Sequence, residues 1–86
     1  MRKYTKVPAI SGKALIKLLK KGGWVIHGRT RHGVSLIKPT PKRTLVTVVP
    51  DTSASLPDGT LSDILGPKQT GIRKRGLLAL INKYGI

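Results

Sequence analysis

The chain has 86 residues and no cysteine, which excludes disulfides and thiolate metal sites and makes a single domain, residues 1–86, the natural expectation. Its 17 lysines and arginines against three acidic residues give a net charge of +14, so we expect a polyanion or an acidic partner to neutralise it. Nucleic acid is the first candidate, an anionic membrane surface the second and a purely structural basic surface the third. Two tyrosines, one tryptophan and no phenylalanine disfavour folds that stack bases on exposed rings, so recognition of phosphates or of shape is expected.

The chain begins with a basic stretch and a predicted helix. Residues 1–10 are expected to form a loose basic lead with no apolar run typical of a signal peptide. A helix is predicted from Ser11, whose hydroxyl suits an N-cap, to the glycine pair at 22–23. Within KALIKLLKK the leucines recur on one face, and the lysines cluster on the opposite face. One interpretation is that these lysines only form a solvated surface. The alternative is that they form a ridge that binds successive phosphates.

Three strands are predicted next, at 24–28, 32–38 and 44–49, because these segments are rich in β-branched residues. A short Arg-Thr-Arg connection and a proline-marked basic turn at 39–43 join them, which predicts an antiparallel meander. Periodicity leaves the buried face open between two sets of apolar residues: Trp24, Ile26 and Ile37, or Val25, Val34 and Leu36.

Two further helices are predicted after a polar loop at 51–59. A short one covers Thr60–Leu65, where Thr60 and Asp63 have the spacing of a capping box, and a last one covers 72–84. The order α-β-β-β-α with an extra C-terminal helix predicts an α+β fold, a three-stranded antiparallel sheet with the helices packed on one face. No apolar segment approaches the ~20 residues of a membrane span, and the lack of cysteine fits a reducing cytoplasm, where we expect the protein.

The side chains available for chemistry are few. Two histidines, three scattered aspartates and neither glutamate nor cysteine leave too few ligands for a metal site, and no glycine-rich phosphate loop occurs, so neither a metal nor a cofactor is expected. The segment GRTRHG, however, places His32 beside Arg29 and Arg31. Histidine titrates near neutral pH and can move a proton, while arginine stabilises charge on a phosphate. Because RNA carries its own nucleophile, the ribose 2′-hydroxyl, these groups suffice for RNA cleavage without a metal.

The second histidine and two glycines of this region each allow two interpretations. If the first two predicted strands pair around residues 28–31, His27 and His32 stand opposite each other, with Cβ atoms roughly 4.5–5.5 Å apart, and divide the acid and base roles. The alternative is that His27 only packs or faces solvent. Gly28 and Gly33 let the backbone and the substrate come close, or serve turn geometry alone.

Five segments in register resemble the HicA-type mRNA interferase toxins, small proteins with a double-stranded-RNA-binding-like fold. The matching segments are SGKALIKLLKKGGW (11–24), GRTRHG (28–33), TLVTVVP (44–50), LPDGTLSDIL (56–65) and KQTGI (68–72). The resemblance implies an endoribonuclease toxin that cleaves mRNA without metal and is held inactive by a HicB-type antitoxin protein. It also implies that His32, at the position of the family's histidine, carries proton transfer.

The sequence therefore predicts a ribonuclease with His32 as its catalytic residue and RNA as its ligand. RNA-binding residues are expected among the arginines of this segment and the basic residues around the second turn: Arg29, Arg31, Lys38, Lys42 and Arg43. The alternative is a non-catalytic basic RNA-binding domain, of a ribosome-associated or double-stranded-RNA-binding type. Loss of His32 separates the two, since binding survives it and cleavage does not.

Overall fold

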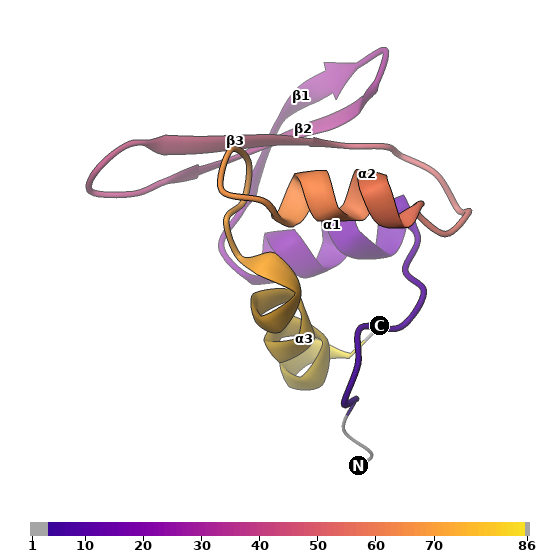
Figure 1. The fold of residues 1–86 in the computed structure, drawn as a ribbon. Helices are drawn as coiled ribbons and strands as arrows, with labels where there is room; N and C mark the ends of the chain where they lie inside the picture. Colours follow the sequence, from indigo (N-terminus) through magenta and orange to yellow (C-terminus); the bar gives the residue numbers. More distant parts are fainter. Residues whose placement is uncertain (1–3, 86) are drawn as a thin grey trace.

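The computed structural model describes residues 4–85, which form three helices and one three-stranded antiparallel sheet (Figure 1). In chain order the elements are α1 (Gly12–Lys21), β1 (Val25–Thr30), β2 (Gly33–Pro39), β3 (Thr44–Val49), α2 (Asp58–Leu65) and α3 (Arg73–Tyr84). Figure 1 shows the helices together on one side of the sheet. The predicted α+β fold, with helices on one face and an extra helix at the C-terminal end, is confirmed.

The buried face of the sheet is built on its central strand. β2 pairs with β1 on one side and with β3 on the other, as the short connections predicted. Across β2 and β3, Val34 lies opposite Val49 and Leu36 opposite Thr47, and all four side chains are buried. Trp24, just before β1, is buried with them. This face and the inner sides of the helices form the core.

A bulge in β1 makes both of the expected apolar sets wrong. The register shifts at His27, so that Ile26 pairs with Leu36 and Val25 with Ile37, whereas uninterrupted alternation placed Ile26 with Ile37. One extra residue moves every side chain beyond it to the other face of the strand, and periodicity alone does not reveal it. Val25 is 57% exposed, so its face of the sheet is open to solvent.

Helix α1 begins and ends where the sequence predicted. The Ser11 hydroxyl accepts a hydrogen bond from the Ala14 amide at 3.1 Å, which satisfies one of the free donors of the first turn. At the other end, the Gly22 amide donates to the Leu18 carbonyl, and Gly23 has a left-handed φ of 102°. The leucines of the inner face are all buried: Leu15, Leu18 and Leu19.

The predicted capping box of the second helix is wrong. α2 begins at Asp58, two residues earlier than expected, so Thr60 lies within its first turn and cannot cap it. Pro57 occupies the N-cap position with φ −59°, and no side chain bonds to the free amides there. The early start has two physical reasons: proline fixes φ close to a helical value, and the Asp58 carboxylate favours the positive end of the helix dipole.

The connection between α2 and α3 is fixed by threonine side chains. The Thr70 hydroxyl is buried and donates to the Ile64 carbonyl at 2.7 Å, which closes the loop on the end of α2. From the sheet, the Thr47 hydroxyl donates to Gln69 Oε1 at 2.6 Å. The loop is therefore attached both to the helix before it and to β3.

Residues 1–10 were expected to be a loose lead; residues 1–3 lie outside the described part of the chain. From residue 4 onward the segment is attached at both ends. Tyr4 exchanges two hydrogen bonds with the Asn82 side chain of α3, its amide donating at 2.7 Å and its carbonyl accepting at 3.1 Å. Ile10 is buried, and its carbonyl accepts from the Leu56 amide at 2.8 Å.

Candidate active site

The segment GRTRHG forms the end of the β1–β2 hairpin. Thr30 pairs with Gly33, so Arg31 and His32 make up the two-residue turn between the strands. The Thr30 hydroxyl closes this turn, because it donates to the Gly33 carbonyl and accepts from the His32 amide, each at 3.1 Å. The backbone that carries His32 is thus held by hydrogen bonds within the hairpin itself.

Gly33 attaches the turn to the third strand. Its φ is 141°, a value that side-chain-bearing residues rarely adopt. A Cβ at this position would overlap the Val49 carbonyl oxygen and lie 2.6 Å from the carbonyl carbon, so only glycine lets β2 approach the end of β3 this closely. Gly28 differs, since its φ is not positive and a Cβ there meets no atom of residues 4–85 within 4 Å. The structure therefore gives a backbone reason for Gly33 and none for Gly28.

His32 presents its imidazole to solvent at the tip of the hairpin. The residue is exposed, and no hydrogen bond to its ring occurs among residues 4–85. Both ring nitrogens are accordingly accessible to a ligand.

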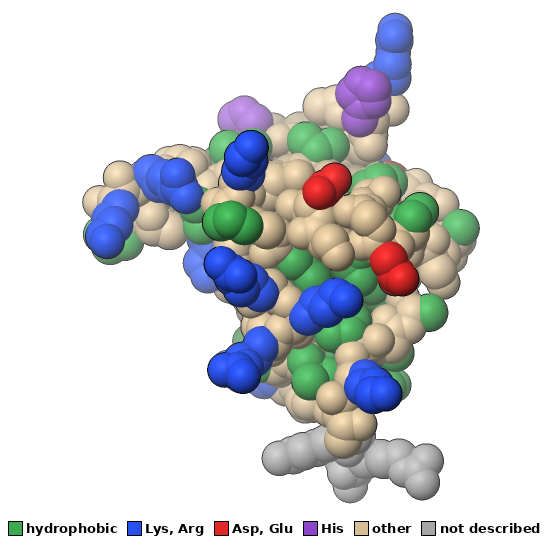
Figure 2. All heavy atoms as spheres, viewed as in Figure 1, with side chains coloured by type: hydrophobic (Ala, Val, Ile, Leu, Met, Phe, Trp, Pro, Cys, Tyr) green, Lys and Arg blue, Asp and Glu red, His purple; other side chains and the backbone are tan. Residues whose placement is uncertain are grey.

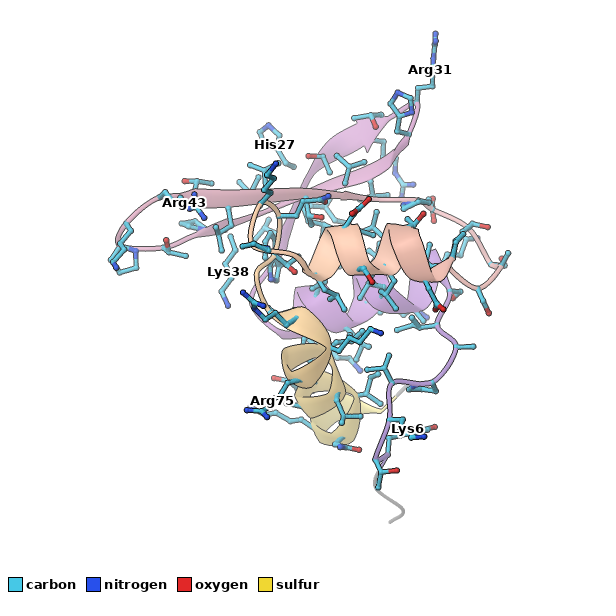
Figure 3. All side chains as sticks on the ribbon, viewed as in Figure 1. Lys6, His27, Arg31, Lys38, Arg43 and Arg75 are labelled. Carbon is cyan, nitrogen blue, oxygen red and sulfur yellow. The ribbon has the colours of Figure 1, made fainter. Side chains whose placement is uncertain are left out.

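Arg29 and Arg31 precede this histidine and differ in their surroundings. Arg31 is exposed in the turn and projects away from the body of the molecule (Figure 3). Arg29 Nη1 donates to Asp51 Oδ2 at 2.9 Å, with the two side chains 71% and 37% exposed. A pair this exposed contributes at most about 1 kcal/mol to stability, but it orients the guanidinium and leaves its other donors free.

Sequence analysis missed Asp51 and Thr30 as parts of this site. Thr30 was read only as part of the connection between strands, although threonine is a common donor and acceptor within turns. Asp51 follows the third strand, and in an antiparallel meander the end of that strand lies beside the first hairpin. The topology alone would thus have placed Asp51 near Arg29.

The remaining expected RNA-binding residues lie at the other end of the sheet. Lys42 and Arg43 belong to the β2–β3 turn, and Lys38 precedes it. Lys38 Nζ donates to the Gly22 carbonyl at 3.2 Å, and Arg43 Nη2 donates to the Pro67 carbonyl at 3.4 Å. β2 has seven residues, so its two ends are about 20 Å apart at ~3.3 Å per residue. Figure 3 shows Arg31 and Arg43 at these opposite ends.

The hypothesis of two facing histidines is wrong. His32 lies in the turn rather than in β2, and His27 sits at the bulge, where β1 loses its regular pairing. His27 is exposed on the side of the sheet away from the helices (Figure 3). The two histidine side chains are well separated in Figure 2. An acid and base pair made of both is therefore excluded in this conformation.

The surface around these residues is predominantly basic. In Figure 2, Lys and Arg side chains are spread over the visible face, and Asp side chains are sparse. Within residues 4–85, no group of three His, Cys, Asp or Glu side chains lies close enough together to hold a metal ion. Across the same residues, no helix has the length and apolar character needed to cross a membrane.

A comparison with protein-family models shows which family the chain belongs to. A family model described as the HicA toxin of bacterial toxin–antitoxin matches residues 12–72, which run from the first residue of α1 to the residue before α3. The chain belongs to the HicA toxin family. The match includes the hairpin with His32, and family membership implies an antitoxin as the partner. No curated protein and no solved structure matches this HicA-family chain.

Proposed function

We propose that this HicA-family toxin is an endoribonuclease that cleaves mRNA in the cytoplasm without a metal, with His32 as the proton-transfer residue. The observation that carries the proposal is the hairpin tip, where an exposed imidazole stands on a fixed backbone next to Arg31, with Arg29 in the strand that leads into the turn. Membership in a toxin family supports this proposal, because a toxin acts on a molecule that the cell needs.

The reaction needs only groups that RNA and this hairpin supply. The ribose 2′-oxygen attacks the adjacent phosphorus, its bond to phosphorus forms, and the bond from phosphorus to the 5′-oxygen breaks. A proton leaves the 2′-hydroxyl and a proton reaches the departing 5′-oxygen, and His32 carries one of these transfers. Because His27 lies away from the turn, water carries the other. The products are a 2′,3′-cyclic phosphate and a free 5′-hydroxyl.

The arginines supply charge where it develops. Negative charge grows on the non-bridging phosphate oxygens as the phosphorane forms, and arginine donors stabilise it through charge-assisted hydrogen bonds. Arg31 lies in the turn next to His32, and Arg29 is held by Asp51 with donors to spare. Lys38, Lys42 and Arg43 lie too far along the sheet to reach the same phosphate. Their ligand would be a distant part of a longer RNA.

The antitoxin of this pair is proposed to be a HicB-type protein that covers the hairpin. A net charge of +14 favours an acidic surface on the partner, because unlike charges across an interface speed encounter and fix orientation. The tip is exposed, and no side chain of residues 4–85 bonds to the His32 ring, so a second protein can cover this surface directly.

A second candidate function is RNA binding without cleavage. The specific observation in its favour is that one histidine stands at the turn without a second titratable side chain bonded to it in the described chain, while Arg29 is already paired with Asp51. Such a hairpin would hold a phosphate without driving both proton transfers. This candidate predicts RNA affinity with no product at any enzyme concentration.

The nature of the nucleophile distinguishes the two candidates. An RNA that the protein cuts is resynthesised with a single 2′-deoxy nucleotide at the cleaved position. If cleavage follows the proposed route, the modified RNA is no longer cut at the 2′-deoxy position but is still cut at its other sites. The unmodified RNA is cut to a product that ends in a 2′,3′-cyclic phosphate. Cleavage of the modified site, or a product with a 5′-phosphate, would show that water attacks instead and would refute the mechanism. Binding of both RNAs with no cleavage of either would support the second candidate.

A further inference from the structure

A groove between α1 and the end of α3 is independent of the hairpin. Its volume is about 470 Å³, and lysines Lys13, Lys17 and Lys21 line it along one side. Tyr84, the last residue of α3, lines it on the other, and no acidic residue is among the lining residues. A basic groove closed by an aromatic ring has the composition of a nucleic-acid site.

The three lysines form a regular row. They recur at every fourth residue, so they share one face of α1 and rise about 6 Å from one to the next. All three are exposed. Like charges at this spacing repel and destabilise a helix, and α1 carries no acidic residue that would neutralise them. A bound polyanion removes this repulsion by placing a phosphate near each ammonium group.

The ring of Tyr84 completes the site. It is 36% exposed, and the Lys21 Nζ lies 5.9 Å from the ring centroid. A second ammonium group, Lys83 Nζ, lies 5.3 Å from the same centroid. Both ammonium groups lie over the ring, so a base that stacks on it displaces them, and they are then close enough to bind the phosphates of that nucleotide.

A lipid surface fits this groove less well than RNA does. A helix that binds a membrane inserts an apolar face into it, with the basic residues at the rim. The apolar face of α1 is buried in the protein core, since Leu15, Leu18 and Leu19 are at most 2% exposed. α1 therefore offers charge but no apolar surface to a bilayer.

We propose that Lys13, Lys17, Lys21 and Tyr84 form a second RNA-binding site, which holds a single-stranded segment by its phosphates and by one base stacked on the ring. The proposal rests on the proposed function, in which RNA is the ligand, and adds a site that family membership does not imply. The family match ends at residue 72, so α3, which supplies Tyr84, lies entirely outside it.

The test compares two variants of equal charge. One carries Lys13→Gln, Lys17→Gln and Lys21→Gln, and the control carries three exposed lysines changed elsewhere: Lys6→Gln, Lys68→Gln and Lys74→Gln. The probe is a fluorescein-labelled 2′-O-methyl octauridylate, which cannot be cut through a 2′-hydroxyl, and binding is followed by anisotropy. Circular dichroism establishes that both variants are folded.

The groove variant should bind the probe at least about 10-fold more weakly than wild type, with a salt slope smaller by about 2, since three phosphate contacts are lost at ~0.7 each. The control variant should lose less than about 3-fold. Tyr84→Leu should bind about 5- to 10-fold more weakly and Tyr84→Phe as wild type does, because stacking needs the ring and not the hydroxyl. Equal loss in the two lysine variants would overturn the proposal.

Failure of this site and failure of the proposed function give different results. If the groove variant binds and cuts RNA as wild type does, the groove is not an RNA site, while cleavage stands. If wild type binds the probe through the groove but cuts no RNA, the groove stands and the ribonuclease proposal falls. If the groove variant loses affinity for the antitoxin and keeps its affinity for RNA, the groove is a protein interface and the inference is wrong.

Discussion

Replacing Gly33 by alanine is expected to destabilise the whole domain. The added Cβ would overlap the Val49 carbonyl oxygen and come 2.9 Å from Pro50 Cα, and both are backbone groups that cannot rotate away. A φ of 141° alone costs a non-glycine residue about 1–3 kcal/mol. Moving β2 away from the end of β3 would weaken ladder hydrogen bonds, each of which contributes about 1 kcal/mol.

We therefore expect Gly33→Ala to lower the free energy of unfolding by about 3 kcal/mol, a large share of the ~5–15 kcal/mol of a typical domain. At ~4–8 °C per kcal/mol for a domain of this size, the melting temperature should fall by about 12–24 °C. Thermal and urea unfolding followed by circular dichroism measure both quantities.

Gly28→Ala is the matched control for this substitution. Gly28 lies in the same hairpin, but its φ is not positive and, in the described part of the chain, no atom lies within 4 Å of an added Cβ. Its stability should stay within about 1 kcal/mol of wild type, with a gain favoured because alanine reduces the freedom of the unfolded chain. If Gly33→Ala were as stable as Gly28→Ala, the close approach of β2 to Val49 would not be a real constraint, and the described hairpin geometry would be wrong.

Three other predictions concern single contacts and charge. Thr47→Val should lower the free energy of unfolding by about 1–2 kcal/mol in urea titrations, because it leaves Gln69 Oε1 without its donor; an unchanged midpoint would mean that this bond does not hold the α2–α3 loop. Asp51→Asn should change the free energy of unfolding by less than about 1 kcal/mol, and it should strengthen RNA binding in anisotropy titrations because Arg29 is released from its ion pair. Weaker binding would show that Asp51 is needed to orient Arg29. Affinity for single-stranded RNA should fall about 100-fold between 50 and 200 mM salt if five phosphates are neutralised, and a flat response would refute recognition through phosphates.

Local signals predicted the elements of the fold, and they failed where the register depends on one residue. Leucine periodicity, the Ser11 cap and the glycine pair defined α1 because each of these acts within a turn or two of helix. The bulge at His27 leaves no mark in the local pattern, yet it sets which face of β1 is buried.

The candidate site was predictable in part for the same reason. The group of Arg29, Arg31 and His32 is contiguous in sequence, so its composition alone indicated phosphate chemistry. Its supports are not contiguous, since Asp51 arrives from the end of β3 and the contact that requires Gly33 comes from Val49. The groove beside Tyr84 was beyond sequence reasoning, because it depends on how α3 packs against α1.

The most direct test of the central claim is an RNA cleavage assay in EDTA with three proteins: wild type, His32→Ala and His27→Gln. All three are first shown to be folded and to bind the same RNA. The account predicts that wild type and His27→Gln cut at equal rates while His32→Ala binds without cutting. Cleavage by His32→Ala at the wild-type rate, or loss of cleavage in His27→Gln alone, would contradict the assignment of proton transfer to His32.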